Sequence, residues 1–333
     1  MIEFNHIQKS NDLPAEWDDL ADNYFQKSRF LLHTENYNPC RQRYYTCTNN
    51  GKLVSAAIVY TLRLDILTFI KVKSPVKMNI IGIPCSVSGK GIFGKKDAIE
   101  ILKKYIRKAE KGFLLFLNLE EEPVKGSLAS GKTLPTVVLK NHFVNWDDYL
   151  AALRANYRRR LMIINQDQQG LWFEKKLCAE FTNEMYRQYL DVYKRSKGKL
   201  EKLSFGFFKY LPPEFTLTVC CKNNSVIGWN IALEYQHTYF FFLGGVDYKQ
   251  NKTNNTYLRL LSNIVKDGIE KKAAVIELGQ TAEIAKMRMG GKPEVRYMEA
   301  SHSNFIANKL IKIFSTFLEY KRKLEKTNAM KEE

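Results

Sequence analysis

The chain has 333 residues, of which 45% are hydrophobic and 13% aromatic, and it carries a net charge of +17 at pH 7. This apolar content excludes a disordered chain and suffices for two domains with hydrophobic cores. No apolar run approaches the length needed to cross a bilayer, and the N-terminus is unlike a signal peptide, so we expect a cytoplasmic protein. The positive charge is spread over both halves and favours anionic partners such as nucleotides, tRNA or lipid head groups.

The first half begins with a predicted short helix over residues 17–25 and a β-hairpin made by 43–48 and 53–64. The hairpin prediction rests on Asn50-Gly51, a strong turn signal between two runs of strand-forming residues. The remaining predicted elements are a strand, an amphipathic helix, a second strand and a linker, over residues 78–85, 95–111, 113–119 and 120–132.

The second half repeats this order of elements. Helices are predicted over 154–169 and 180–197, followed by a hairpin of 215–222 and 226–234. A strand, a helix and a strand follow, over residues 237–244, 255–271 and 274–278. From about Ser303 the chain predicts a C-terminal amphipathic helix, in which Ile306, Leu310 and Ile313 share a helical register.

The six cysteines, at positions 40, 47, 85, 178, 220 and 221, do not form a C-x-x-C pattern. Cys220 and Cys221 are adjacent in a predicted strand and therefore point to opposite faces. We expect buried apolar cysteines, with no disulfide framework and no metal site.

Residues 146–160, WDDYLAALRANYRRR, place several arginines on one short predicted helix. Its apolar residues are spaced by three or four and predict a single stripe, Leu150, Leu153, Tyr157 and Leu161. Arg158 and Arg159 flank this stripe. Guanidinium groups on a rigid element suit a phosphate or carboxylate, although solvated helix charges are the alternative interpretation.

Three motifs in this order resemble the GNAT superfamily, in its BioF2-like or FemAB-like acetyltransferase domain. They are the NYRRRL run at 156–161, the YFFFLGG strand at 239–245 followed by Asp247, and the K-x-x-x-G ending at 286–290. The resemblance covers about residues 146–300 and is weak before them. It implies an α/β (α+β) fold of two tandem GNAT-like domains with mixed sheets flanked by helices. The expected division is a degenerate domain over 1–140 and a second domain, with the C-terminal helix, over 141–333.

The resemblance also implies the catalytic residues. Lys286 corresponds to a family lysine near the transfer centre, where a buried cation would stabilise a developing oxyanion or hold a phosphate. Glu277 lies where the family has an acidic residue, and Asp247 matches the aspartate after the double glycine. A surface lysine and a structural carboxylate are the alternatives for Lys286 and Glu277.

Residues for the donor's anionic groups are predicted in both halves. In the second half they are Arg158, Arg159, Lys249, Lys252 and Arg288. The loop at 246–255 contains no glycine, so it departs from the usual acetyl-CoA loop. In the first half, Ser88, Gly89, Lys90 and Gly91 form a glycine loop whose amides could hold a phosphate, although a flexible turn is the simpler interpretation.

The leading functional hypothesis is an N-acyltransferase that moves an acyl group from acyl-CoA, used as co-substrate without a permanently bound cofactor, to an amine. The acceptor would be an amino sugar, an amino acid or a cell-envelope precursor. A Fem-type peptidyltransferase that uses aminoacyl-tRNA is the alternative, favoured by the charge and the missing glycine loop. The second alternative is a non-enzymatic binder of nucleic acid or anionic membrane. Peripheral membrane association fits the C-terminal helix, whereas DNA is not expected because no DNA-binding motif is evident.

Overall fold

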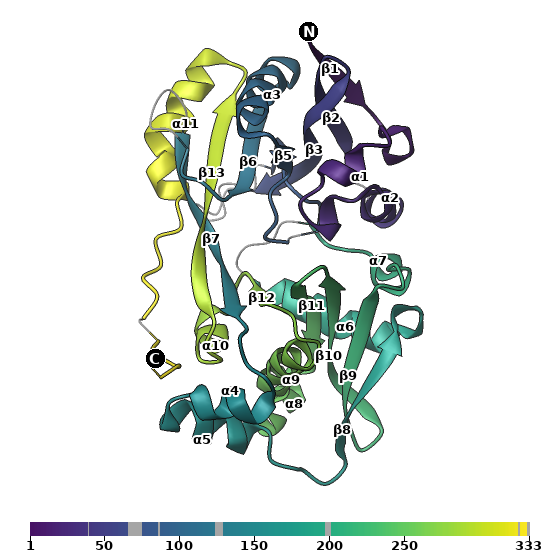
Figure 1. Ribbon diagram of the computed structural model, residues 1–333, viewed down its shortest axis with the longest axis vertical. Helices are drawn as coiled ribbons and strands as arrows, with labels where there is room; N and C mark the ends of the chain where they lie inside the picture. Colours follow the sequence, from purple (N-terminus) through teal and green to yellow (C-terminus); the bar gives the residue numbers. More distant parts are fainter. Residues whose placement is uncertain are drawn as a thin grey trace. The chain divides into compact units, whose positions relative to one another are not determined.

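The computed structural model describes residues 1–38, 40–65, 75–85, 87–123, 129–196, 201–325 and 327–331. Contacts between residues divide the chain into two compact units (Figure 1). Unit 1 comprises Met1–Pro135 and Val295–Lys321, and unit 2 comprises Thr136–Glu294 and Arg322–Glu333. This division differs from the single predicted boundary after residue 140, because a C-terminal segment returns to unit 1.

Unit 1 is built on a mixed sheet with the strand order β1-β2-β3-β4-β6-β13, and β5 also pairs with β3. Its strands are β1 (Ile2–Ile7), β2 (Arg43–Asn49), β3 (Lys52–Asp65), β4 (Pro75–Ile81), β5 (Ile92–Gly94), β6 (Phe113–Leu119) and β13 (Lys292–His302). Its helices are α1 (Trp17–Leu20), α2 (Ser28–Tyr37), α3 (Lys96–Ala109) and α11 (Phe305–Leu318). The predicted hairpin, the helix over 95–111 and the strand over 113–119 are all present.

Successive residues of β2 and β3 pack against helices on opposite faces of the sheet of unit 1. Tyr44 and Ile58 pack with Trp17 of α1, whereas their neighbours Tyr45 and Val59 pack with Leu102 of α3. Successive strand residues point to opposite faces, so α1 and α3 cover different sides. The sheet therefore lies between two layers of helix, as in the predicted α+β architecture.

Unit 2 has the strand order β7-β12-β11-β10-β9-β8. Its strands are β7 (Ala129–Lys140, in this unit from Thr136 onward), β8 (Leu171–Leu177), β9 (Phe215–Lys222), β10 (Ser225–Tyr235), β11 (Thr238–Val246) and β12 (Val275–Gly279). Its helices are α4 (Trp146–Ala152), α5 (Ala155–Ile164), α6 (Asn183–Arg195), α7 (Phe205–Lys209), α8 (Tyr248–Asn254), α9 (Thr256–Glu270) and α10 (Glu283–Met287). The predicted loop over 246–255 is largely helix α8, and the predicted helix over 255–271 is α9.

The helices α6 and α9 cover opposite faces of the sheet in unit 2 (Figure 1). The indole of Trp229 donates from Nε1 to the carbonyl of Met185 in α6, at 3.0 Å. On the other face, a Cβ at Gly228 would lie 2.7 Å from Thr256 and 3.0 Å from Leu260 of α9. This close approach explains why glycine occupies position 228.

The two units share one plan, as the repeated order of predicted elements indicated. In each unit, an antiparallel hairpin is followed by a strand, a helix and a second strand. The two strands on either side of the helix pair in parallel. The parallel ladders join Met78–Ile81 to Phe113–Phe116 in unit 1 and Thr238–Phe240 to Val275–Glu277 in unit 2. In each unit a further antiparallel strand then pairs with the last of these, β13 with β6 and β7 with β12.

The stretch 146–160 is two helices, so the prediction of one continuous element is wrong. α4 ends at Ala152, and Leu153 and Arg154 are extended before α5 begins. A hydrogen bond from the amide of Arg154 to the carbonyl of Ala329 fixes the break. Leu153 and Leu161 are nevertheless both buried in one core, with Leu150 and Tyr157 packed against it. The predicted apolar stripe therefore faces the core from two helices.

Several predicted segments extend outside the described residues. These are residues 124–128 of the predicted linker and residue 197 at the end of the predicted helix over 180–197. Among the described residues, all six cysteines are buried. Within the same residues, no helix is long and apolar enough to cross a membrane.

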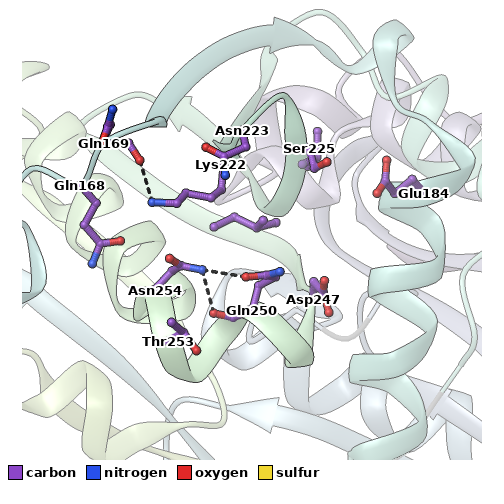
Figure 2. Close-up of a pocket in the computed structure, with 12 residues that line it drawn as sticks. Gln168, Gln169, Glu184, Lys222, Asn223, Ser225, Asp247, Gln250, Thr253 and Asn254 are labelled. Carbon is purple, nitrogen blue, oxygen red and sulfur yellow. Dashed lines mark hydrogen bonds between the residues drawn. The ribbon is translucent and has the colours of Figure 1, made fainter.

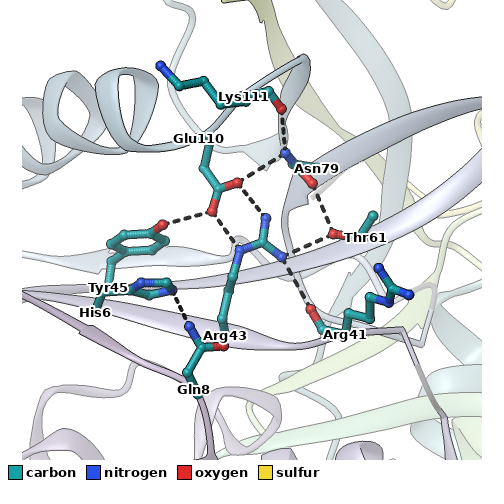
Figure 3. Close-up of polar contacts among 9 residues, drawn as sticks. All are labelled: His6, Gln8, Arg41, Arg43, Tyr45, Thr61, Asn79, Glu110 and Lys111. Atoms are coloured by element: carbon teal, nitrogen blue, oxygen red, sulfur yellow. Dashed lines mark hydrogen bonds and ion pairs between the residues drawn. The ribbon is translucent and has the colours of Figure 1, made fainter.

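A buried polar network fastens β2, β3 and β4 to the end of α3 in unit 1 (Figure 3). Arg43 binds both carboxylate oxygens of Glu110 at 2.6 Å, and Tyr45 donates to Glu110 at 2.8 Å. Asn79 donates to the same carboxylate at 3.0 Å. Burial alone raises the pKa of Glu110, but Arg43 and Tyr45 outweigh it and hold the pKa below its ordinary value. The carboxylate is therefore a satisfied structural anion.

Candidate functional site

Lys286 is buried at the end of the parallel ladder in unit 2. It lies on α10, which follows β12 after a tight turn, and only 3% of its side chain is exposed. The turn contains three left-handed residues, Gly279 (φ 72°), Thr281 (φ 62°) and Ala282 (φ 48°). Left-handed backbone at Thr and Ala is costly, by roughly 1–3 kcal/mol each, and such strain concentrates at functional sites. This turn directs the Lys286 amine inward.

The contacts of the Lys286 amine are few. Nζ donates to the carbonyl of Gln280 at 2.6 Å and lies 5.7 Å from the centre of the Phe241 ring. A Cβ at Gly279 would lie 3.9 Å from Nζ. Among the described residues, no carboxylate forms an ion pair with this amine. The charged form is therefore poorly compensated.

Burial lowers the pKa of Lys286 to about 7, against the opposing effect of Glu283 and Glu277. Glu283 is itself buried and forms an ion pair with Arg322 at 3.2 Å. Desolvation disfavours the charged form of an amine, which is why its pKa falls. At neutral pH the amine can therefore both accept and release a proton, as a general base requires.

The strands β11 and β12 pair over a short length and then separate beside this amine. Their ladder ends at Phe240 and Glu277, whereas β11 continues to Val246 in partnership with β10. Phe241, whose ring lies under the Lys286 amine, is the first residue of β11 beyond the ladder. The amine therefore lies where the two parallel strands stop pairing.

The two predicted carboxylates occupy different environments. Glu277 is half-buried on β12 at the last ladder pair, and its charge acts on the Lys286 amine. Asp247 lies at the other end of β11, where its side chain accepts a 2.8 Å hydrogen bond from the amide of Lys249 and caps α8. Asp247 follows Phe241 by six positions, about 20 Å along a strand. The structure therefore places Glu277, and not Asp247, beside Lys286.

The predicted anion-binding residues do not form one cluster. Arg158 donates to the carbonyls of Ala151 and Leu153 at 3.4 Å, so it binds the open end of α4. Arg159 is exposed on α5. The other three predicted cations are also exposed, Lys249 and Lys252 on α8 and Arg288 after α10. Cations at a helix C-terminus are favourable, which gives Arg158 a structural role.

A polar cavity of about 800 Å³ lies at the Asp247 end of β11 (Figure 2). Its walls are the segment before β8, the β9–β10 turn, the start of α6 and one side of α8, represented by Gln168, Asn223, Glu184 and Gln250. Lys222 donates across it to the carbonyl of Gln169 at 2.7 Å. Amide groups that both donate and accept, beside the carboxylates of Glu184 and Asp247, suit neutral polar groups better than phosphates.

Close packing explains why glycine occupies the paired positions in two of the sequence motifs. A Cβ at Gly245 would lie 2.6 Å from the indole of Trp229, and one at Gly291 would lie 2.5 Å from Val137. Gly290 has a φ of 86° and packs against Met330. These glycines allow the close approach of elements that hold β11 and α10 in place.

In the glycine loop of unit 1, the charged group of Lys90 is already paired within the protein. Lys90 forms ion pairs with Asp22 at 2.8 Å and Glu120 at 2.9 Å. A Cβ at Gly91 would lie 2.1 Å from the backbone nitrogen of Gly82, so this loop packs tightly against the end of β4. Partial burial lowers the pKa of Lys90, but the two carboxylates outweigh it and raise the pKa. Ser88 and Gly89 belong to the same packed segment, which disfavours an added phosphate.

We expect Lys90→Met to lower the free energy of unfolding by about 1 kcal/mol, because Asp22 and Glu120 lose their shared cation while remaining partly exposed. Urea denaturation of the two proteins measures this difference. The amine of Lys96, which is exposed and pairs with Glu121, provides a matched control, since Lys96→Met should change stability less. Unchanged stability together with weaker binding of an anionic donor would instead assign Lys90 to a ligand site.

The sequence did not indicate the partners of Lys286 or the cavity. Gln280 contributes only its backbone carbonyl, and Phe241 is one of several aromatic residues in β11, so neither has a distinctive pattern. The run Gly279 to Ala282 carries a weak signal, since glycine after a strand marks a special turn. The cavity residues come from four separate segments, and their side-chain types are common on surfaces.

No family model matches the chain, and no curated protein sequence matches it. Solved structures match its fold. A tandem GNAT protein from the clavulanic acid biosynthesis pathway is 9% identical, with a TM-score of 0.54 over 91% of this chain and 99% of that one. FemX is 10% identical, with a TM-score of 0.53 over 94% and 100%. L-PGS from Bacillus licheniformis is 11% identical, with a TM-score of 0.50 over 86% and 91%. The GNAT fold inferred from the motifs is therefore confirmed, and identities this low concern the fold alone.

Proposed function

We propose that this protein is an N-acyltransferase in which unit 2 moves an acyl group from acyl-CoA to an amine. The acceptor would be an amino sugar, an amino acid or a cell-envelope precursor. The observation that carries the proposal is the buried Lys286 amine at the point where β11 and β12 separate. A group that can take a proton, placed where two parallel strands stop pairing, suits attack of an amine on a thioester.

In the proposed reaction, the neutral acceptor nitrogen attacks the thioester carbonyl and the new C–N bond forms. The nitrogen then carries an extra proton, which the neutral Lys286 amine accepts. The C–S bond breaks, and the departing thiolate takes a proton from the protonated lysine or from water. No covalent enzyme intermediate is required. This role replaces the fixed cation expected from the sequence resemblance, because a pKa of about 7 leaves the amine half neutral.

Glu277 supports this role electrostatically. Its charge raises the pKa of Lys286, as does that of Glu283, so the two carboxylates partly offset desolvation. A general base works best when its pKa is near the operating pH. We assign Glu277 as a residue that tunes the base and Lys286 as the residue that contacts the reacting atoms.

A different donor, aminoacyl-tRNA, is the second candidate. The observations that favour it are the +17 charge and α8, which stands where an acyl-CoA loop with glycines would be expected. Lys249 and Lys252 are exposed on this helix. Binding of tRNA through such cations would weaken steeply as the salt concentration rises.

The experiment that tests the proposal is a thermal-shift titration with acetyl-CoA, longer acyl-CoAs, free CoA and bulk tRNA. A ligand that binds only the folded state stabilises it in proportion to the logarithm of its concentration over Kd. A saturable rise with a CoA species supports the acyl-CoA proposal. A salt-sensitive response to tRNA alone favours the aminoacyl donor instead, and no response to any of these donors would contradict both.

A further inference from the structure

The helix α11 of unit 1 presents an apolar face that its own packing does not use. Its inner side is held by Ile311, which is buried against Ala129 and Ala300. Four large apolar side chains on the outer side are exposed, from 50% of Leu310 to 70% of Phe305, with Ile306 and Ile313 between these values. Positions 305, 306, 310 and 313 fall on one side of a helix with 3.6 residues per turn. These four side chains therefore share one face of α11 between Phe305 and Ile313.

Two basic side chains accompany this face. At 3.6 residues per turn, Lys309 lies between Phe305 and Ile313 on the helix surface, and Lys312 lies at the edge of the face, beside Phe305. Both are exposed, and the Lys309 amine lies 4.5 Å from the centre of the Phe305 ring. The sequence from Ser303 to Leu318 contains no aspartate or glutamate. The charged side chains of α11 are therefore all cationic, and they accompany its exposed apolar side chains.

The positive charge of α11 favours one of the two surfaces that could cover it, a second copy of the helix or an anionic bilayer. If α11 packed against its counterpart in a second copy, the lysines of the two copies would approach each other with no carboxylate on either helix to pair with them. An anionic plane has the complementary charge and also accepts apolar side chains. Helices of this kind lie in the interface of a bilayer, with the apolar face toward the acyl chains. The 14 residues of α11 suit that position.

We propose that α11 binds the surface of anionic lipid bilayers. Phe305, Ile306, Leu310 and Ile313 enter the boundary between head groups and acyl chains, and Lys309 and Lys312 contact lipid phosphates. The surface potential of anionic lipids attracts such lysines within about a Debye length. The proposal concerns unit 1 and does not depend on acyl transfer in unit 2.

The test is cosedimentation of the full chain with vesicles of phosphatidylcholine alone and of phosphatidylcholine mixed with phosphatidylglycerol. We expect binding to the mixed vesicles, weakened by added salt, and little binding to the neutral ones. Replacing both lysines, as Lys309→Gln with Lys312→Gln, should reduce binding by about fivefold per lysine. Replacing Ile306→Ser with Ile313→Ser should reduce binding to both kinds of vesicle.

The matched controls carry the same chemical changes elsewhere on the surface. Val144→Ser with Leu177→Ser removes two exposed apolar side chains of unit 2, and Lys194→Gln with Lys266→Gln removes two exposed lysines. Both controls should bind mixed vesicles like the wild type, and thermal unfolding should show that every variant is folded. Equal loss in the controls, or no vesicle binding by the folded wild type, would overturn the proposal. Light scattering that shows a dimer lost only in the α11 variants would instead assign the face to a second copy.

Discussion

The variant Lys286→Met should lose acyl transfer by roughly 10²–10⁴-fold while remaining folded, because it removes the proposed general base and keeps the shape of the side chain. At about pH 6 we expect it to be more stable than the wild type. The amine of Lys286 is buried without an ion-pair partner among the described residues, and a charge in that position costs free energy. Transfer is measured as release of the CoA thiol in the presence of an amine panel, and stability by urea unfolding.

The matched control for this variant is Lys266→Met, which removes an exposed lysine from α9 in the same unit. It should retain both transfer and stability. If Lys286 were a structural residue, Lys286→Met would unfold at lower urea concentration than the wild type at every pH. If it were a bystander, the variant would transfer acyl groups at the rate of the control.

The difference in stability between wild type and Lys286→Met should depend on pH with a defined sign. In the folded protein the pKa of Lys286 is about 7, below its ordinary value of 10.5. Between these values the unfolded chain binds the extra proton and the folded chain does not, so wild-type stability rises with pH over this window. Below it both states are protonated, and the full cost of burying the charge is present. At about 1.4 kcal/mol per pKa unit, the change amounts to a few kcal/mol.

Unfolding midpoints of both proteins at about pH 6, 7.5 and 9 measure this change. The variant should be the more stable protein at the lowest pH. At the highest pH the gap should be much smaller, because much of the cost of burying the lysine is gone and the neutral amine keeps its hydrogen bond to Gln280, worth about 1 kcal/mol. Other groups titrate alike in both proteins and cancel in the difference. A gap that is constant with pH, or that widens as pH rises, would mean that burial does not depress this pKa.

Local signals in the sequence predicted the repeated plan of the fold. The hairpin at Asn50-Gly51 follows from turn chemistry, and helices α3 and α9 follow from apolar periodicity. These elements depend on contacts between near neighbours, which a single sequence records. The order of a strand, a helix and a strand in each half also suits the parallel pairing that the structure shows.

The last strand of each sheet could not be predicted in the same way. β7 leaves the first half of the chain to pair with β12, and β13 returns from the end of the second half to pair with β6. Tyr297 of β13 pairs with Leu119, far away in the sequence. Such pairing is decided by tertiary packing, and residue pattern alone does not encode its partner. For the same reason α11, predicted with the second half, belongs to unit 1.

The site was predictable only in part. Lys286 and Glu277 were identified by their resemblance to a family pattern, and the structure brings both to the end of one ladder. The resemblance implied a buried cation at Lys286, but the neighbouring residues left a surface lysine as the alternative, because a lysine beside Arg288 and Met289 also resembles a surface turn. Arg158 shows the opposite case. Its cluster of arginines suggested anion binding, whereas the break after α4 gives its guanidinium two backbone carbonyls to bind.

The difference between the two units explains why the proposed chemistry is assigned to unit 2. In unit 1, Asn118 at the end of β6 donates to the carbonyl of Val87 at 3.0 Å, and Gly82 pairs with Lys90. The loop that contains Val87 and Lys90 therefore covers the end of that parallel ladder. In unit 2 the corresponding end is beside the Lys286 amine. Unit 1 is better suited to a supporting role, which its proposed lipid contact would provide.

The pH dependence of acyl transfer tests the central claim most directly. The acceptor should be an aromatic amine, which stays neutral over the range studied, so that only the protein titrates. For the wild type, kcat/KM should rise with pH and level off above an apparent pKa of about 7, where Lys286 becomes neutral. In Lys286→Met the small remaining rate should lack this titration. A wild-type rate that falls above this pKa, or a titration that persists in the variant, would contradict Lys286 as the proton acceptor.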